Sequence, residues 1–174
     1  KRTWSKENRP SIVAKPGLHP KKVLLSIWWD WKGVVYYELL PQGETINFNK
    51  YCNQLDQLKA AIAEKRPEMA NRRGVVFHHD NAKPHVALAV RQKLLQIDWD
   101  VLPHPPYSPD LAPSDYYLFL SLKNSVRVKC FKSVSEIKTH LDEYFASKSQ
   151  QFWKEGIMRL PERWKKVIEQ NGSY

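Results

Sequence analysis

The chain has 174 residues, of which 42% are apolar and 26% are charged, and its net charge is +10. This composition is typical of one folded domain and excludes a disordered chain, while the absence of any apolar run near ~18 residues excludes a membrane-spanning helix. Because 28 Lys and Arg face only 18 Asp and Glu, a polyanionic partner is indicated, and nucleic acid is the first candidate.

The N-terminal segment 1–22 is predicted to form an extended basic loop. It holds seven Lys or Arg, one Glu and three prolines. Proline lacks a backbone donor and restricts the residue before it, so this composition disfavours helix and strand. The sequence begins at Lys1 without an initiator methionine, and we expect further residues upstream of it.

A hairpin and an amphipathic helix are predicted to follow. Two β-rich runs, 22–29 and 34–40, flank a short polar turn and predict paired strands. Apolar residues at spacings of three and four then predict a helix over about 46–66, capped by Thr45 or Asn47.

A strand–helix–strand unit comes next. Residues 75–77 and 99–102 predict two short strands, and Pro84 suits the first turn of the helix between them. Four prolines in the segment 104–113 exclude helix there, and a short aromatic helix is expected over about 116–122.

The remainder of the chain is predicted to be helical. Ser133 and Glu136 form a capping box at the start of one helix, residues 150–160 form a second helix, and Pro161 starts a third. Strands that alternate with helices predict an α/β fold, a mixed sheet flanked by helices, in one domain. Its parts are the basic loop 1–22, the hairpin and α/β core 23–120, and the C-terminal helices 121–174.

Two acidic residues follow the strands of this unit. Asp80 comes just after strand 75–77, and Asp115 follows the proline-rich loop after strand 99–102. If the two strands are neighbours, both carboxylates lie at one edge of the sheet. Two converging carboxylates are the minimum for holding Mg²⁺, and a metal pair can activate water or a 3′-hydroxyl in phosphodiester chemistry. Capping of the next helix is the alternative role for Asp80.

The segments around these two acids resemble a known family. The sequence HDNAKPH at 79–85 and the sequence VLPHPPYSPDLAPSDYYLF at 101–119 are similar to the catalytic segments of mariner-family transposases. That family uses three Asp, and the spacing between its second and third Asp equals the spacing between Asp80 and Asp115. The resemblance implies an RNase H-like fold, Mg²⁺ or Mn²⁺ as cofactor, and metal-dependent DNA cleavage and strand transfer. It also implies transposon-end and target double-stranded DNA as partners, a homodimer and a nuclear location.

One part of the family pattern is missing from this sequence. The first acid of the family stands in an Asp-Glu-Lys-Trp motif upstream of the position of Trp4, and this sequence has no such motif. We therefore expect either that the third ligand lies outside this sequence, in a longer transposase, or that this is a decayed or domesticated transposase that lacks its first strand. Asp30 is expected to be a turn residue and not a substitute ligand.

Basic residues and histidines near the motifs are candidate DNA contacts. Lys and Arg with few acids around them can follow a phosphate backbone, although solvated surface is the alternative interpretation. A catalytically inactive module that binds DNA or another protein is accordingly the alternative function. The candidate DNA-binding residues are Lys21, Lys22, Lys83, His85, Lys123, Arg127 and Lys129.

Overall fold

A β-hairpin lies at the centre of the computed structural model, which describes residues 22–70 and 75–172. Strands β1 (Leu24–Asp30) and β2 (Gly33–Leu40) pair antiparallel, which confirms the predicted hairpin. Gly33 opens β2 with φ of 129°, a conformation that residues with a Cβ rarely adopt. The predicted basic loop lies outside the described residues, except for Lys22.

The hairpin leads into helix α1 (Phe48–Lys65), followed by the short α2 (Pro67–Ala70). Asn47 caps α1, and its side chain accepts a hydrogen bond of 2.9 Å from the backbone of Lys50. The predicted helix and one of its two proposed caps are therefore confirmed. Tyr51, Leu55 and Leu58 form its buried face.

The strand–helix–strand unit consists of β3 (Val75–Phe77), α3 (Leu88–Gln96) and β4 (Trp99–Val101). The two strands are parallel neighbours, as the placement of both acids requires. Helix α3 begins at Leu88 and not near Pro84, so the predicted start is wrong. Backbone amides of His85 and Val86 both donate to the carbonyl of Ala82, and this turn occupies the residues before the helix.

The proline-rich segment contains a 3-10 turn (Pro109–Leu111), and the C-terminal part begins with a π-helical turn (Ser114–Phe119). Helices α4 (Leu120–Val126), α5 (Val134–Ala146) and α6 (Gln150–Glu169) follow. The Ser133 cap of α5 is confirmed. The predicted break at Pro161 is wrong, because α6 continues through it. Its buried face, which includes Trp153, Gly156 and Leu160, outweighs the backbone hydrogen bond that proline cannot make.

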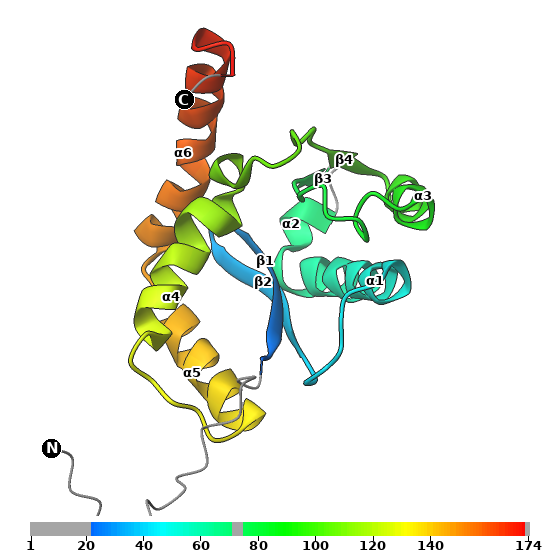
Figure 1. The fold of residues 1–174 in the computed structure, drawn as a ribbon. Helices are drawn as coiled ribbons and strands as arrows, with labels where there is room; N and C mark the ends of the chain where they lie inside the picture. The colour runs from blue at the N-terminus through cyan, green and yellow to red at the C-terminus, as the bar shows by residue number, and fades with distance from the viewer. Residues whose placement is uncertain (1–21, 71–74, 173–174) are drawn as a thin grey trace, which may run out of the picture.

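Two hydrophobic clusters cover opposite faces of the hairpin (Figure 1). Helix α1, α3 and the β3–β4 pair pack on one face around Val35 and Leu55, and α4, α5 and α6 pack on the other around Leu118 and Trp153. The described strands form two separate pairs, β1–β2 antiparallel and β3–β4 parallel. Within the described residues, no helix is long and apolar enough to cross a bilayer.

Candidate functional site

A cavity of about 210 Å³ lies where the two strand pairs and the C-terminal helices meet. One wall is formed by the consecutive residues 25–28 of β1. The cavity is also lined by His78, His79 and Asp80, which directly follow β3, and by the residues Ala112–Asp115. The structure therefore brings Asp80 and Asp115 to the same cavity, from segments that follow neighbouring strands.

The carboxylate of Asp80 is held by two donors on one of its oxygens. The Nδ1 of His85 donates to Asp80 Oδ1 at 2.5 Å, and the backbone amide of Ala82 donates to the same oxygen at 3.1 Å. The hydrogen bond from His85 is the main reason why the pKa of Asp80 falls to about 2. Asp80 is therefore ionised at neutral pH, with its second oxygen available to a ligand.

The ring of His85 is positioned by Tyr51 of α1. The two rings stack with centroids 4.0 Å apart, and the Tyr51 hydroxyl is 3.0 Å from Nδ1 of His79. Tyr51 is only 2% exposed, and burial is the main cause of its raised pKa, followed by the charge of Asp80. The sequence pattern assigned Tyr51 only to the apolar face of α1. Its contact with the site could not be inferred, because His79 lies 28 positions further along the chain.

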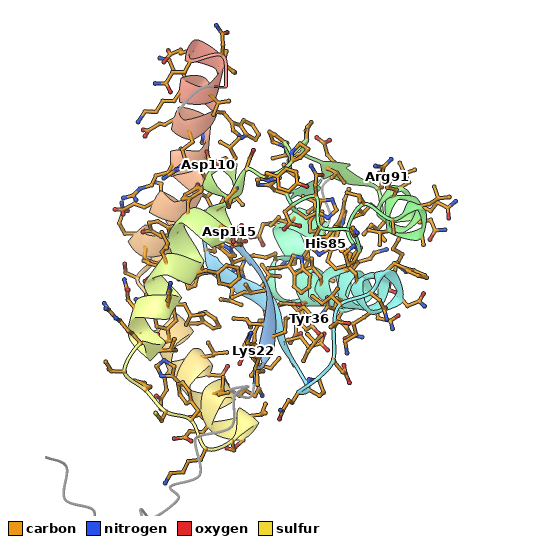
Figure 2. All side chains as sticks on the ribbon, in the orientation of Figure 1. Lys22, Tyr36, His85, Arg91, Asp110 and Asp115 are labelled. Carbon is orange, nitrogen blue, oxygen red and sulfur yellow. The ribbon has the colours of Figure 1, made fainter. Side chains whose placement is uncertain are left out.

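Asp115 is the second residue of the π-helical turn and is exposed to solvent. Partial desolvation of its carboxyl group by neighbouring residues raises the pKa of Asp115, and the negative charge of Asp80 raises it further. Figure 2 shows Asp115 on the side of α4 and α6, and His85 on the side of α1 and α3. A turn of this rare helical type often marks a functional site.

This arrangement fits a divalent cation. The carboxylates of Asp80 and Asp115 line one cavity, and they supply the hard oxygen ligands that Mg²⁺ and Mn²⁺ prefer. The charge of Asp80 raises the pKa of Asp115, and a bound cation would relieve this repulsion. Two carboxylates are also an incomplete set of ligands for a metal ion. Across residues 22–70 and 75–172, no three His, Cys, Asp or Glu side chains gather closely enough to hold a metal ion.

Two histidines and an amide connect the segments that follow the two parallel strands. His78 Nε2 and His104 Nδ1 are 3.1 Å apart, and Asn81 donates from Nδ2 to the carbonyl of His104. These contacts tie the segment after β3 to the segment after β4. They favour the structural interpretation of His78 and His104 over phosphate contact.

Comparison with known proteins agrees with this geometry. The family described as transposase (partial DDE domain) matches residues 1–72. A solved structure of the Mos1 transposase catalytic domain, with raltegravir and Mn, is 50% identical to this chain with a TM-score of 0.86, and the match covers 88% of this chain and 78% of that one. The chain belongs to the mariner transposase family.

The match also confirms the RNase H-like fold of this mariner-family chain. The mariner Mos1 transposase of Drosophila mauritiana is 46% identical over 176 residues, which cover 100% of this chain. The chain spans 51% of the length of that relative. A crystal structure of the Mos1 mariner paired end complex with Mn matches with 46% identity and a TM-score of 0.87, over 100% of this chain and 51% of that chain.

Asp30 of this mariner-family chain ends β1 at the hairpin turn, as expected. Its carboxylate accepts from the backbone amide of Lys32 at 2.8 Å and pairs with Arg66, whose Nε lies 2.7 Å from Asp30 Oδ2. The side chains of Asp30 and Arg66 are only 14% and 12% exposed. Asp30 is not among the residues that line the cavity of Asp80 and Asp115.

Among the described residues, the predicted DNA-binding residues come from different parts of the fold: before β1, after β3, on α4 and after α4. His85 contacts Asp80, whereas Lys22, Lys83, Lys123, Arg127 and Lys129 are exposed, and Lys21 lies outside the described residues. Segments 1–21 and 71–74 hold eight of the 28 Lys and Arg and one of the 18 Asp and Glu. These two segments therefore supply seven of the ten net positive charges.

Proposed function

We propose that this part of a mariner transposase contributes Asp80 and Asp115 to a Mg²⁺ or Mn²⁺ site that cleaves transposon-end DNA and joins it to target DNA. The observation that carries the proposal is that both carboxylates line one cavity, behind neighbouring parallel strands and with the family's spacing along the sequence. When bound, such ions supply activation of water or a 3′-hydroxyl and stabilisation of the leaving oxygen.

The residues of the chain have separate parts in this proposal. Asp80 remains ionised because His85 and the amide of Ala82 bind one of its oxygens, so the other oxygen can bind a cation. Asp115 supplies the second carboxylate from another segment that lines the same cavity. The third acidic ligand of the family pattern would come from residues outside this sequence.

The partners we propose are double-stranded DNA, as transposon end and as target, and a second copy of the protein. The net charge of +10 supports a DNA partner. The paired end complex of the Mos1 relative supports an assembly that holds DNA ends together. A protein that acts on chromosomal DNA would work in the nucleus.

Metal binding tests the site without requiring catalysis. Free Mn²⁺ is measured by electron paramagnetic resonance while the 174-residue chain is titrated with the ion. We expect weak binding that decreases more than about tenfold in Asp80→Asn and in Asp115→Asn, because an outer-shell change alone costs about 10-fold to 100-fold. Asp142→Asn, a change on α5 in a residue that does not line the cavity, is the matched control and should bind as the parent does. Equal binding by all four chains would overturn the proposal.

DNA binding should be nearly independent of sequence and sensitive to salt. Each phosphate that the chain neutralises contributes about 0.9 to the slope of log K against log salt. Replacing Lys21 and Lys22 by alanine should weaken binding to all duplexes alike and lower that slope. Lys93→Ala is the control, because Lys93 already pairs with Asp56 at 2.6 Å. Fluorescence anisotropy at several salt concentrations measures both effects, and an unchanged slope in the double variant would contradict the prediction.

A catalytically inactive module that binds DNA or another protein is the second candidate. It is favoured by the presence of only two carboxylates at the cavity and by the lack of any three-ligand cluster within the described ranges. With two acids, we expect the 174-residue chain to nick supercoiled DNA inefficiently in Mg²⁺. The two candidates differ in the Mn²⁺ titration, since the inactive module would show no loss of binding in Asp80→Asn.

A further inference from the structure

Asp80 and Asp115 are held in different ways. Asp80 has two donors on its carboxylate, whereas the carboxylate of Asp115 makes no hydrogen bond within the described residues. The position of Asp115 is therefore set by the backbone of the π-helical turn that carries it. The contacts that hold this turn in place therefore determine where the carboxylate of Asp115 lies.

The turn rests directly on helix α6 at Gly156. A Cβ at this position would be 2.6 Å from Cδ1 of Tyr117 and 2.7 Å from Cη2 of Trp29, distances that real side chains do not allow. Glycine is therefore required here for close packing and not for an unusual φ. The hydroxyl of Tyr116 donates to the carbonyl of Gly156 at 2.7 Å, which ties the residue after Asp115 to the same point of α6.

About two helical turns further along α6, Arg163 holds both flanks of Asp115. Its guanidinium lies over the ring of Tyr116 with 4.1 Å between Cζ and the ring centroid. Its Nη1 donates to the carbonyl of Asp110 at 3.0 Å, in the 3-10 turn that precedes the π-helical turn. A single side chain thus fixes the chain on both sides of Asp115.

We propose that Gly156 and Arg163 are positioning residues, which place the carboxylate of Asp115 at the cavity by docking the π-helical turn on α6. The metal part of this inference rests on the function proposed above. Neither residue lines the cavity, so both act on the site through the turn. Substitutions at Gly156 or Arg163 should therefore loosen the turn and weaken metal binding, while the hydrogen bonds of Asp80 remain unchanged.

Three substitutions test this by different means. Gly156→Ala inserts a methyl group into the contact with Tyr117 and Trp29. Tyr116→Phe removes only the hydroxyl that binds the Gly156 carbonyl, so it is expected to fold even if Gly156→Ala does not. Arg163→Lys keeps the charge but removes the planar group that covers Tyr116.

Two controls separate positioning from general loss of stability. Lys165→Arg keeps the charge and alters a side chain of α6 that is 77% exposed and pairs with Glu169 on the same helix. Leu58→Ala destabilises α1 through a buried side chain that is 2% exposed and belongs to the other hydrophobic cluster, which does not include the π-helical turn.

The readouts are hydrogen exchange of the peptide that covers 114–119, measured without metal, and Mn²⁺ affinity. We expect loss of exchange protection in that peptide in all three variants, and an Mn²⁺ affinity about 10-fold lower in Gly156→Ala and Arg163→Lys. Both controls should keep the protection and the affinity of the parent. Unchanged exchange at 114–119 in Tyr116→Phe and Arg163→Lys would overturn the inference. If the parent itself binds no Mn²⁺, the proposed function fails, while the exchange measurement still decides whether α6 holds the turn.

Discussion

Replacing Trp153 by alanine is expected to lower the free energy of unfolding by about 3–5 kcal/mol. Trp153 is 3% exposed and lies at the centre of the cluster between β1, α5 and α6. Its ring contacts those of Trp29, Phe145 and Phe152, with centroids 5.6, 6.3 and 5.2 Å away. The loss combines the transfer of a large apolar surface to water with a cavity that rigid aromatic neighbours cannot fill.

Denaturation in urea measures this effect. Trp31→Ala is the matched control, since Trp31 stands at the hairpin turn and is 46% exposed. Its stability should remain within about 0.5 kcal/mol of the parent. A loss in Trp153→Ala no larger than that of the control would show that the aromatic cluster does not stabilise the C-terminal helices.

Replacing Tyr51 by alanine is expected to damage both stability and the site. Because the ring is buried and stacks on His85, we expect a loss of about 3–5 kcal/mol. His85 would then lose the surface that orients it toward Asp80, and Mn²⁺ affinity should decrease together with stability.

Tyr51→Phe separates the two contributions of this residue. It keeps the ring under His85 and removes only the hydroxyl bond to His79, a change worth about 0.5–1.5 kcal/mol. Mn²⁺ affinity should then equal that of the parent. Urea denaturation and Mn²⁺ titration of both variants measure these effects. An affinity in Tyr51→Ala equal to that in Tyr51→Phe would contradict the role of the ring.

Helix starts that depend on contacts between residues close in the sequence were predicted correctly. Asn47 and Ser133 cap their helices as the sequence indicates, because each cap bonds a backbone amide three residues away. The start of α3 could not be predicted from Pro84, since the turn around Ala82 uses the preceding residues to bring His85 to Asp80. The interior position of Pro161 likewise depends on packing of α6 along its whole length.

The two acids of the proposed site were predicted from the sequence, whereas the residues that hold them in place were not. Asp80 and Asp115 follow strands whose adjacency could be inferred from their order. Gly156 and Arg163 contact residues 40 and 53 positions away, and no local spacing indicates such contacts. A glycine and an arginine inside an amphipathic helix carry no separate signal until the fold places the π-helical turn against them.

We propose that Asp80 and Asp115 form one metal site. Anomalous diffraction from a crystal soaked in Mn²⁺ tests this proposal most directly. We predict an Mn²⁺ peak within about 2 Å of a carboxylate oxygen of each residue, or a pair of ions about 4 Å apart that the two residues share. Carboxylates more than about 10 Å apart, or Mn²⁺ bound away from both of them, would contradict a shared site.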